Sequence, residues 1–117
     1  MFEKRYSKMN SDKQRAAIAL YCGWKVEDNE YKRWTSPSGT RWNYPPAYDK
    51  DLNAMHEAEK ILYPDSKQSE RYAEFLLDVL EIPSPFIGTA RCAFLTNHAT
   101  AAQRAEAFLK TIGKWEE

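Results

Sequence analysis

The residues best suited to bind a ligand lie in one aromatic and basic stretch in the first half of the chain. It includes Trp24, Lys25, Lys32, Arg33, Trp34, Arg41, Trp42, Tyr44 and Tyr48, all within 25 positions. Basic side chains can pair with a phosphate while an aromatic ring stacks on a base, and each stacked base contributes about 1–3 kcal/mol. The pattern therefore favours a binding site for a small anionic ligand such as a nucleotide.

The same rings would also suit a hydrophobic core. Trp and Tyr fit the half-buried surface of a β-sheet, and the basic residues between them would then lie outward in solvent. We expect this core role for Trp24 and Trp34. Both interpretations stay open for the residues near the Pro45-Pro46 pair, which are the first candidates for ligand binding. These candidates are Arg41, Trp42, Tyr44 and Tyr48.

Two residues in the second half of the chain are added to the candidate ligand site. His98 comes just before the predicted start of the last helix, where unpaired N–H groups and the helix dipole favour an anion. Arg91 lies in a segment of alternating side chains and could supply a further positive charge. The alternative for His98 is a loop residue that packs at the helix entrance.

The sequence offers little for catalysis. His56 has only Glu59 and Lys60 at neighbouring helical positions, so a His–Glu pair is the most that can form, and a metal site would need another ligand. Cys22 is expected at a helix C-terminus, where the dipole raises a thiol pKa, and Cys92 is expected in the core. No phosphate-binding glycine loop or nucleophile motif is recognised. We therefore expect no catalytic residue, no metal and no cofactor.

Four helices are predicted from their caps and their apolar periodicity. The first begins with a capping box formed by Ser11 and Gln14, and the second begins at Asp49 or Asp51, just before apolar residues spaced for one helical face. Together the expected helices cover about residues 11–22, 51–62, 65–81 and 100–113.

The segment between the first two helices predicts a small sheet. Its side chains alternate with a period of two residues between polar turns, which indicates a three-stranded antiparallel meander over 24–44, and alternation over 89–95 predicts a fourth strand. Helices before and after the meander would cover both of its faces. We therefore expect an α+β fold, a three-layer α-β-α sandwich with a mainly antiparallel sheet of about four strands and about four helices. A chain of 117 residues has room for one such domain, over 11–117, after an N-terminal tail over 1–10.

The charge is balanced overall but unevenly distributed. Residues 1–50 carry ten basic and six acidic side chains, whereas residues 51–117 carry seven basic and eleven acidic ones. Because no net positive field surrounds the whole molecule, binding to nucleic acid is not expected. No apolar run approaches the roughly 18–20 residues that span a bilayer, and the first ten residues lack the apolar centre of a signal peptide. We therefore expect a cytoplasmic protein with reduced cysteines and no membrane contact.

Two long segments resemble the phage ABA sandwich domain family. They are residues 51–59 (DLNAMHEAE) and 98–115 (HATAAQRAEAFLKTIGKW). The order of features is also similar: an Ala-rich first helix, a Gly-Trp pair, aromatic hairpins and a Pro-Pro-x-Tyr motif precede the second helix. The resemblance covers nearly the whole chain from about Ser11 and implies the same helix–sheet–helix sandwich. It implies a small phage or prophage protein, and most members of that family have no assigned activity.

These observations lead to one expected function and three alternatives. We expect a non-catalytic phage accessory protein that binds a small anionic ligand and sequesters a nucleotide immune signal of cyclic or ADP-ribose type. A pocket closed between subunits would exclude water, so we expect a homo-oligomer in the host cytoplasm. The main alternative is a protein-interaction module that binds or inhibits a host protein through acidic helix faces or an exposed aromatic loop. The other two are a nucleic-acid binder and a metal-dependent hydrolase of phosphate esters.

Overall fold

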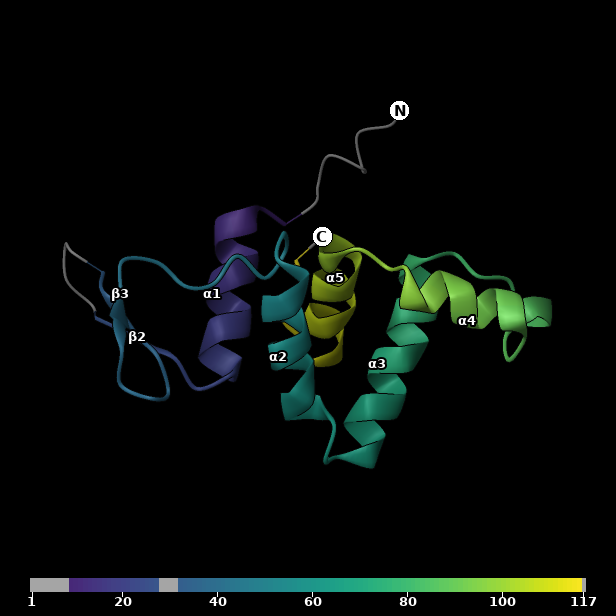
Figure 1. Ribbon diagram of the computed structural model, residues 1–117, viewed down its shortest axis with the longest axis horizontal. Helices are drawn as coiled ribbons and strands as arrows, with labels where there is room; N and C mark the ends of the chain where they lie inside the picture. Colours follow the sequence, from purple (N-terminus) through teal and green to yellow (C-terminus); the bar gives the residue numbers. More distant parts are fainter. Residues whose placement is uncertain (1–8, 28–31, 117) are drawn as a thin grey trace.

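The computed structural model describes residues 9–27 and 32–116, which form five α-helices, a three-stranded sheet and a short 3-10 helix. In chain order these are α1 (Ser11–Tyr21), β1 (Lys25–Val26), β2 (Trp34–Thr35), β3 (Arg41–Trp42), α2 (Leu52–Leu62), α3 (Ser66–Val79), η2 (Ser84–Phe86), α4 (Ala90–Asn97) and α5 (Ala101–Thr111). The prediction of an α+β fold is confirmed. The sheet lies at one end of the molecule beside α1, and α4 projects at the opposite end (Figure 1).

The last helix, α5, is the centre of the hydrophobic core. It packs against α1, α2 and α3. Phe108 and Leu109 of α5 are fully buried, as are Ile18 of α1 and Met55 and Leu62 of α2. Removing these large apolar side chains from water is the main favourable contribution to folding. The core is therefore built mainly by helices, with the sheet attached at its edge.

Three of the predicted helix starts are capped as the sequence indicates. The carboxylates of Asp51 and Asp65 accept hydrogen bonds from backbone N–H groups in the first turns of α2 and α3. Thr100 forms the predicted capping box with Gln103 at the start of α5. Each cap satisfies N–H groups that have no partner inside the helix.

The start of α1 differs from the prediction. Asn10, not Ser11, is the N-cap residue, and its side chain accepts a hydrogen bond from a backbone N–H of the first turn. Nε2 of Gln14 donates to the carbonyl oxygen of Met9 at 2.7 Å, and Met9 is itself buried. The packed chain therefore begins before the predicted end of the N-terminal tail at residue 10. The rest of that tail, residues 1–8, lies outside the described residues.

The predicted fourth strand is wrong, because residues 90–97 form α4 instead. The hydroxyl of Thr89 caps this helix by accepting from the N–H of Cys92 at 3.2 Å. Alternating small and apolar residues fitted a strand, but Ala, Arg and Leu are also strong helix formers, and Thr is a good cap. The three-layer sandwich is not confirmed either, since the three strands lie beside the helices rather than between two helix layers (Figure 1).

The sheet is a short antiparallel meander, as predicted. Its pairing places Val26 opposite Trp34 and Trp34 opposite Trp42. Directly opposed residues share a face of a sheet, so these three side chains form one row. Trp34 is buried and joins the hydrophobic core, whereas Trp42 is 52% exposed. The predicted turn over 28–30 lies outside the described residues. Only the middle member of the row is buried, because Val26 is 38% exposed, and the exposed Trp42 forms part of a pocket.

Candidate functional site

A pocket of about 500 Å³ lies between the sheet, α1 and the chain that follows β3. Three aromatic side chains, three serine or threonine hydroxyls, two prolines and one guanidinium group surround it. Its lining residues are Arg15, Trp24, Ser36, Ser38, Thr40, Trp42, Tyr44, Pro45, Pro46 and Ala47. We call it the aromatic pocket. Its volume falls within the range of about 300–1,000 Å³ that is usual for small-molecule sites.

The hydroxyl wall of the aromatic pocket is a tight turn between β2 and β3. The N–H of Ser36 donates to the carbonyl of Thr40 at 2.8 Å, and the N–H of Gly39 donates to the carbonyl of Ser36 at 2.9 Å. Gly39 has a φ of 97°, a left-handed conformation that glycine adopts without strain. The hydroxyls of Ser36 and Ser38 lie 2.9 Å apart. The turn therefore adds hydroxyl groups to a pocket that is otherwise lined mainly by aromatic rings and prolines.

Trp24 reaches the aromatic pocket because α1 ends sharply just before it. Gly23 has a φ of 98°, and the N–H of Trp24 then donates back to the carbonyl of Ala19 at 3.0 Å. A Cβ atom on Gly23 would lie 3.5 Å from Cγ of Pro37, so the end of α1 lies close to the turn between β2 and β3. The helix end and this turn therefore lie on the same side of the pocket.

Arg15 contributes the positive charge of the aromatic pocket. Its Nε donates to Oδ1 of Asp49 at 2.6 Å, and the hydroxyl of Ser11 donates to Oδ2 of the same carboxylate at 2.7 Å. Burial alone would raise the pKa of Asp49, but the hydrogen bonds from Ser11 and Arg15 and the charge of Arg15 lower it below its ordinary value. Asp49 therefore stays ionised and holds the guanidinium group at the pocket wall.

The structure brings only part of the predicted ligand site together. Trp42 and Tyr44 line the aromatic pocket and are 52% and 74% exposed. Tyr48 is buried in the core, and its burial, more than the nearby Cys22, raises the pKa of its phenol well above the ordinary value. Arg41 forms an exposed ion pair with Glu27 and does not line the pocket.

Arg91 and His98 do not belong to the aromatic pocket. Arg91 is on α4, where its guanidinium carbon lies 5.6 Å from the centre of the Phe86 ring. His98 follows α4 and stacks on Phe94 with ring centres 4.1 Å apart, and its Nδ1 lies 2.8 Å from the Phe94 carbonyl oxygen. The sheet and α4 lie at opposite ends of the molecule (Figure 1). The structure therefore does not bring the six candidate residues together around one pocket, and only Trp42 and Tyr44 of them line it.

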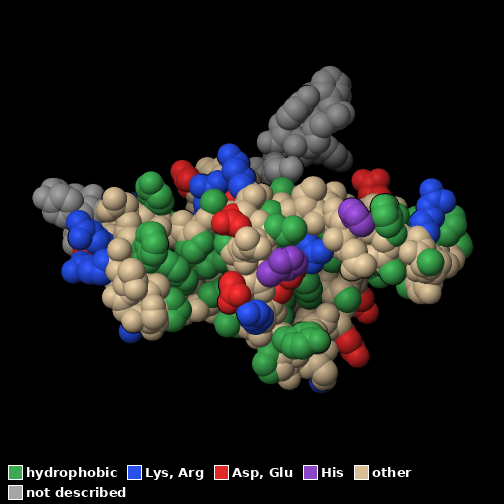
Figure 2. Space-filling model, viewed as in Figure 1, with side chains coloured by type: hydrophobic (Ala, Val, Ile, Leu, Met, Phe, Trp, Pro, Cys, Tyr) green, Lys and Arg blue, Asp and Glu red, His purple; other side chains and the backbone are tan. Residues whose placement is uncertain are grey.

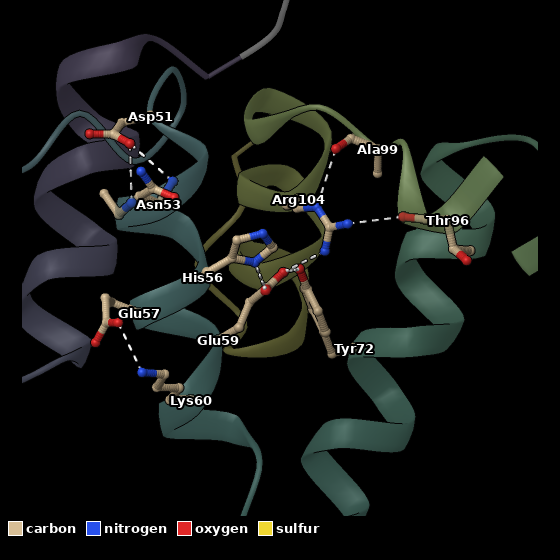
Figure 3. Close-up of polar contacts among 11 residues, drawn as sticks. Asp51, Asn53, His56, Glu57, Glu59, Lys60, Tyr72, Thr96, Ala99 and Arg104 are labelled. Atoms are coloured by element: carbon tan, nitrogen blue, oxygen red, sulfur yellow. Dashed lines mark hydrogen bonds and ion pairs between the residues drawn. The ribbon is translucent and has the colours of Figure 1, made fainter. Parts of the chain in front are cut away.

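A second group of polar side chains joins α2, α3 and α5 (Figure 3). One carboxylate oxygen of Glu59 lies 2.9 Å from Nδ1 of His56. The other oxygen accepts hydrogen bonds from the hydroxyl of Tyr72 and, at 3.0 Å, from a terminal nitrogen of Arg104. Burial raises the pKa of Tyr72 well above its ordinary value, and the negative charge of Glu59 adds to this effect. We call these four residues the Glu59 cluster.

The Glu59 cluster borders a second pocket, of about 350 Å³. Its walls are Leu62, Tyr63 and Tyr72, and its polar groups include His56 and Ser69. The two histidines of the chain, purple in Figure 2, lie apart on the face shown there. His56 lines the second pocket, whereas His98, which follows α4, does not.

Several of these residues had no signal in the sequence analysis. Arg15 meets Asp49 across 34 positions, and Arg104 meets Glu59 across 45 positions, so neither contact has a local pattern. The hydroxyl wall could have been suspected, because Ser36 to Gly39 form a recognisable turn sequence next to Trp42. The His56–Glu59 spacing of three positions did indicate the pair that forms.

Within residues 9–27 and 32–116, no group of three or more His, Cys, Asp or Glu side chains is close enough to hold a metal ion. None of the helices in these ranges has the length and apolar character that crossing a membrane requires. Comparison with protein-family models, curated proteins and solved structures finds no match. The similarity to phage ABA sandwich proteins therefore depends on the sequence segments alone and stays a prediction.

Proposed function

We propose that this protein binds a small anionic ligand with a planar ring, such as a nucleotide, in the aromatic pocket. The observation that carries the proposal is the meeting of Trp24, Trp42 and Tyr44 with the Arg15 guanidinium around one open pocket. Indole and phenol rings stack on planar groups, and a guanidinium group pairs with a phosphate. The pocket therefore combines the two kinds of contact that such a ligand needs.

The chemistry of the lining favours recognition of the ligand over its conversion. The hydroxyls of Ser36, Ser38 and Thr40 can donate to or accept from ribose and phosphate oxygens. Arg15 is oriented by Asp49, so less side-chain freedom is lost when a ligand binds. In its narrower form, the proposal is that a homo-oligomer sequesters a cyclic or ADP-ribose-type nucleotide in a bacterial cytoplasm. That form depends on the resemblance to phage proteins.

Calorimetric titration with matched compounds tests the proposal. ADP-ribose and AMP carry both a ring and a phosphate, adenosine lacks the phosphate, and ribose 5-phosphate lacks the ring. We expect clearly tighter binding of the compounds with both groups. Trp42→Ala should weaken it by roughly fivefold or more, because a stacked base contributes about 1–3 kcal/mol. Phe94→Ala removes an exposed ring of similar accessibility on α4 and serves as the control.

Two results would contradict the proposal. One is the absence of any heat or thermal shift with these compounds at millimolar concentration. The other is an equal loss of affinity in Trp42→Ala and Phe94→Ala. Native mass spectrometry of the protein purified from bacteria tests the narrower form, because it gives the number of subunits and the mass of any small molecule that co-purifies.

A second candidate function, the binding of a host protein, is favoured by the surface around α4. Phe86, Ile87, Phe94 and Leu95 are all between 39% and 59% exposed. Hydrophobic side chains (green) are visible at this end of the molecule in Figure 2. Exposed apolar groups that lie together often mark a protein interface. A partner that the intact protein and Trp42→Ala retain, but that Phe94→Ser loses, would support this function.

A further inference from the structure

The end of the molecule that carries α4 is exposed but almost without charge. Charged residues make up 29% of the whole chain, whereas Arg91 is the only one among residues 82–99. Residues 83–91 are all exposed, and α4 projects away from the other helices (Figure 1). A surface that stays in contact with water normally carries charged side chains throughout. This end therefore has the composition of a surface that another molecule covers.

The outer face of α4 is apolar. Cys92 is buried and Thr96 is half-buried, so these two side chains mark the face of the helix that is turned to the rest of the protein. The opposite face is exposed and has the spacing of a helical stripe, with Ala90, Ala93, Phe94 and Asn97. A helix of eight residues has little stability of its own, because isolated helices shorter than about 12–15 residues are marginal in water. A partner on the outer face would therefore stabilise α4.

The charges around α4 are arranged for self-association. Arg91 lies near the free end of the helix. At the other end, Ala99 shares a hydrophobic cluster with Leu76 of α3, so the exposed acidic residues Asp78 and Glu81 lie near that end. None of the ion pairs formed among residues 9–27 and 32–116 involves these three charged side chains. One end of the surface is thus positive and the other is negative.

We propose that α4 is a dimer interface and packs antiparallel against α4 of a second copy of this chain. A two-fold axis then places Arg91 of each copy beside Asp78 and Glu81 of the other, so both ends of the interface gain opposite charges. Antiparallel packing also places the positive end of each helix dipole beside the negative end of the other. This complementarity favours a second copy over an unrelated protein.

The outer stripe of α4 also has the side-chain sizes that such packing needs. Phe94 is large, and Ala90 and Ala93 on the same face are small. In an antiparallel pair, the Phe94 ring of one copy can lie over the two alanines of the other. Large side chains that face small ones let two helices approach closely without leaving a cavity.

This dimer leaves the aromatic pocket free. The sheet lies at the end of the molecule opposite α4, so the two aromatic pockets would lie at the outer ends of the dimer and not between its subunits (Figure 1). Ligand binding and dimerisation therefore use separate surfaces. Either of the two proposals can fail while the other holds.

Sedimentation velocity from micromolar to millimolar concentration tests the interface. We expect the intact protein to change from monomer to dimer over this range. Phe94→Glu should weaken dimerisation by about tenfold or more, because it would bury an unpaired charge in the interface. Leu20→Glu, at a side chain of similar exposure on α1, is the matched control and should leave the dimer unchanged. Circular dichroism checks that both variants keep their helices.

Charge reversal tests the antiparallel arrangement. Arg91→Glu should weaken the dimer severalfold, and so should the paired change Asp78→Lys with Glu81→Lys, because each brings like charges together. All three changes in one chain restore opposite charges and should return most of the affinity. Should Phe94→Glu fail to fold, these changes at exposed positions still decide the question.

Three results would overturn the proposal. The first is a protein that stays monomeric at all concentrations, which is also the result expected if the surface around α4 serves only a host protein. The second is an equal loss of dimer in Phe94→Glu and Leu20→Glu. The third is a combined charge reversal that does not restore the affinity lost in the separate ones.

Discussion

Nε of Arg15 lies 2.6 Å from Oδ1 of Asp49, and this pair connects α1 to the loop that precedes α2. The side chains are 23% and 7% exposed, so water screens the attraction only in part. Ser11 donates to the second carboxylate oxygen at 2.7 Å and completes its hydrogen bonding. One ion pair therefore joins two segments of the fold and fixes the charged wall of the aromatic pocket.

Replacing the carboxylate of this pair should destabilise the protein. We expect Asp49→Asn to lower the free energy of unfolding by about 2–4 kcal/mol, because a partly buried guanidinium group loses its counter-charge. The control is Glu57→Gln, which breaks a pair with Lys60 whose side chains are 72% and 70% exposed, and which should cost less than about 1 kcal/mol. Urea unfolding measures both values. Equal losses would contradict the prediction that the ion pair between Arg15 and Asp49 stabilises the fold more than an exposed pair does.

The same pair predicts a dependence of stability on pH. The pKa of Asp49 is lower in the folded protein than its ordinary value of 3.8, so its contribution is fully present above that value. As the pH falls below 3.8 towards the folded pKa, the carboxyl group takes up a proton and the contribution is lost. The difference in unfolding free energy between the intact protein and Asp49→Asn should therefore shrink in acid. A difference that stays constant would contradict this prediction.

Two threonine caps of the same kind should have different effects. Thr100 caps α5 in the hydrophobic core, so Thr100→Ala should lower global stability by about 1 kcal/mol. Thr89 caps α4, in which Cys92 is the only buried residue. Thr89→Ala should therefore speed amide hydrogen exchange within α4 and change the midpoint of thermal unfolding very little. Similar losses of global stability in the two variants would show that α4 and the core unfold together.

Cys22 should react slowly in the folded protein. Burial raises the pKa of its thiol from 9.0 to about 11, so the thiolate fraction near pH 8 falls by about a hundredfold. Iodoacetamide should modify Cys22 far more slowly in buffer than in urea, as measured by mass spectrometry of the peptide that contains it. Because the unfolded thiol ionises first, this group also favours unfolding as the pH rises from 9 towards 11. Equal rates in buffer and in urea would contradict the partly buried position of Cys22.

Local signals in the sequence predicted most of the helices. Asp51, Asp65 and Thr100 are caps whose partners lie two or three positions away, so their side chains and the apolar periodicity that follows are both visible in the sequence. The segment after Thr89 was misread for a physical reason. Its eight helical residues are a mixture of small and apolar types that fits a strand as well as a helix. The sequence pattern alone therefore does not distinguish the two structures.

The sequence predicted only those parts of the candidate site whose residues are close together in the chain. Trp42 and Tyr44 follow a turn and line the pocket as proposed from the sequence. Arg91 was placed in a predicted strand that is α4 in the structure, and His98 was chosen for its position before α5, a local signal that says nothing of its distance from the sheet. Arg15 was missed because its orientation depends on Asp49, a partner that only the tertiary structure brings near.

Arg104 connects the projecting α4 to the Glu59 cluster in the body of the molecule. A single guanidinium group holds the carbonyls of Thr96 and Ala99, at the base of the projecting α4, and also the carboxylate that orients His56. A load that pulls α4 away from the body must therefore stretch or break bonds to the same side chain that keeps the imidazole in place. A partner that displaced α4 should therefore also disturb the hydrogen bond between Glu59 and His56.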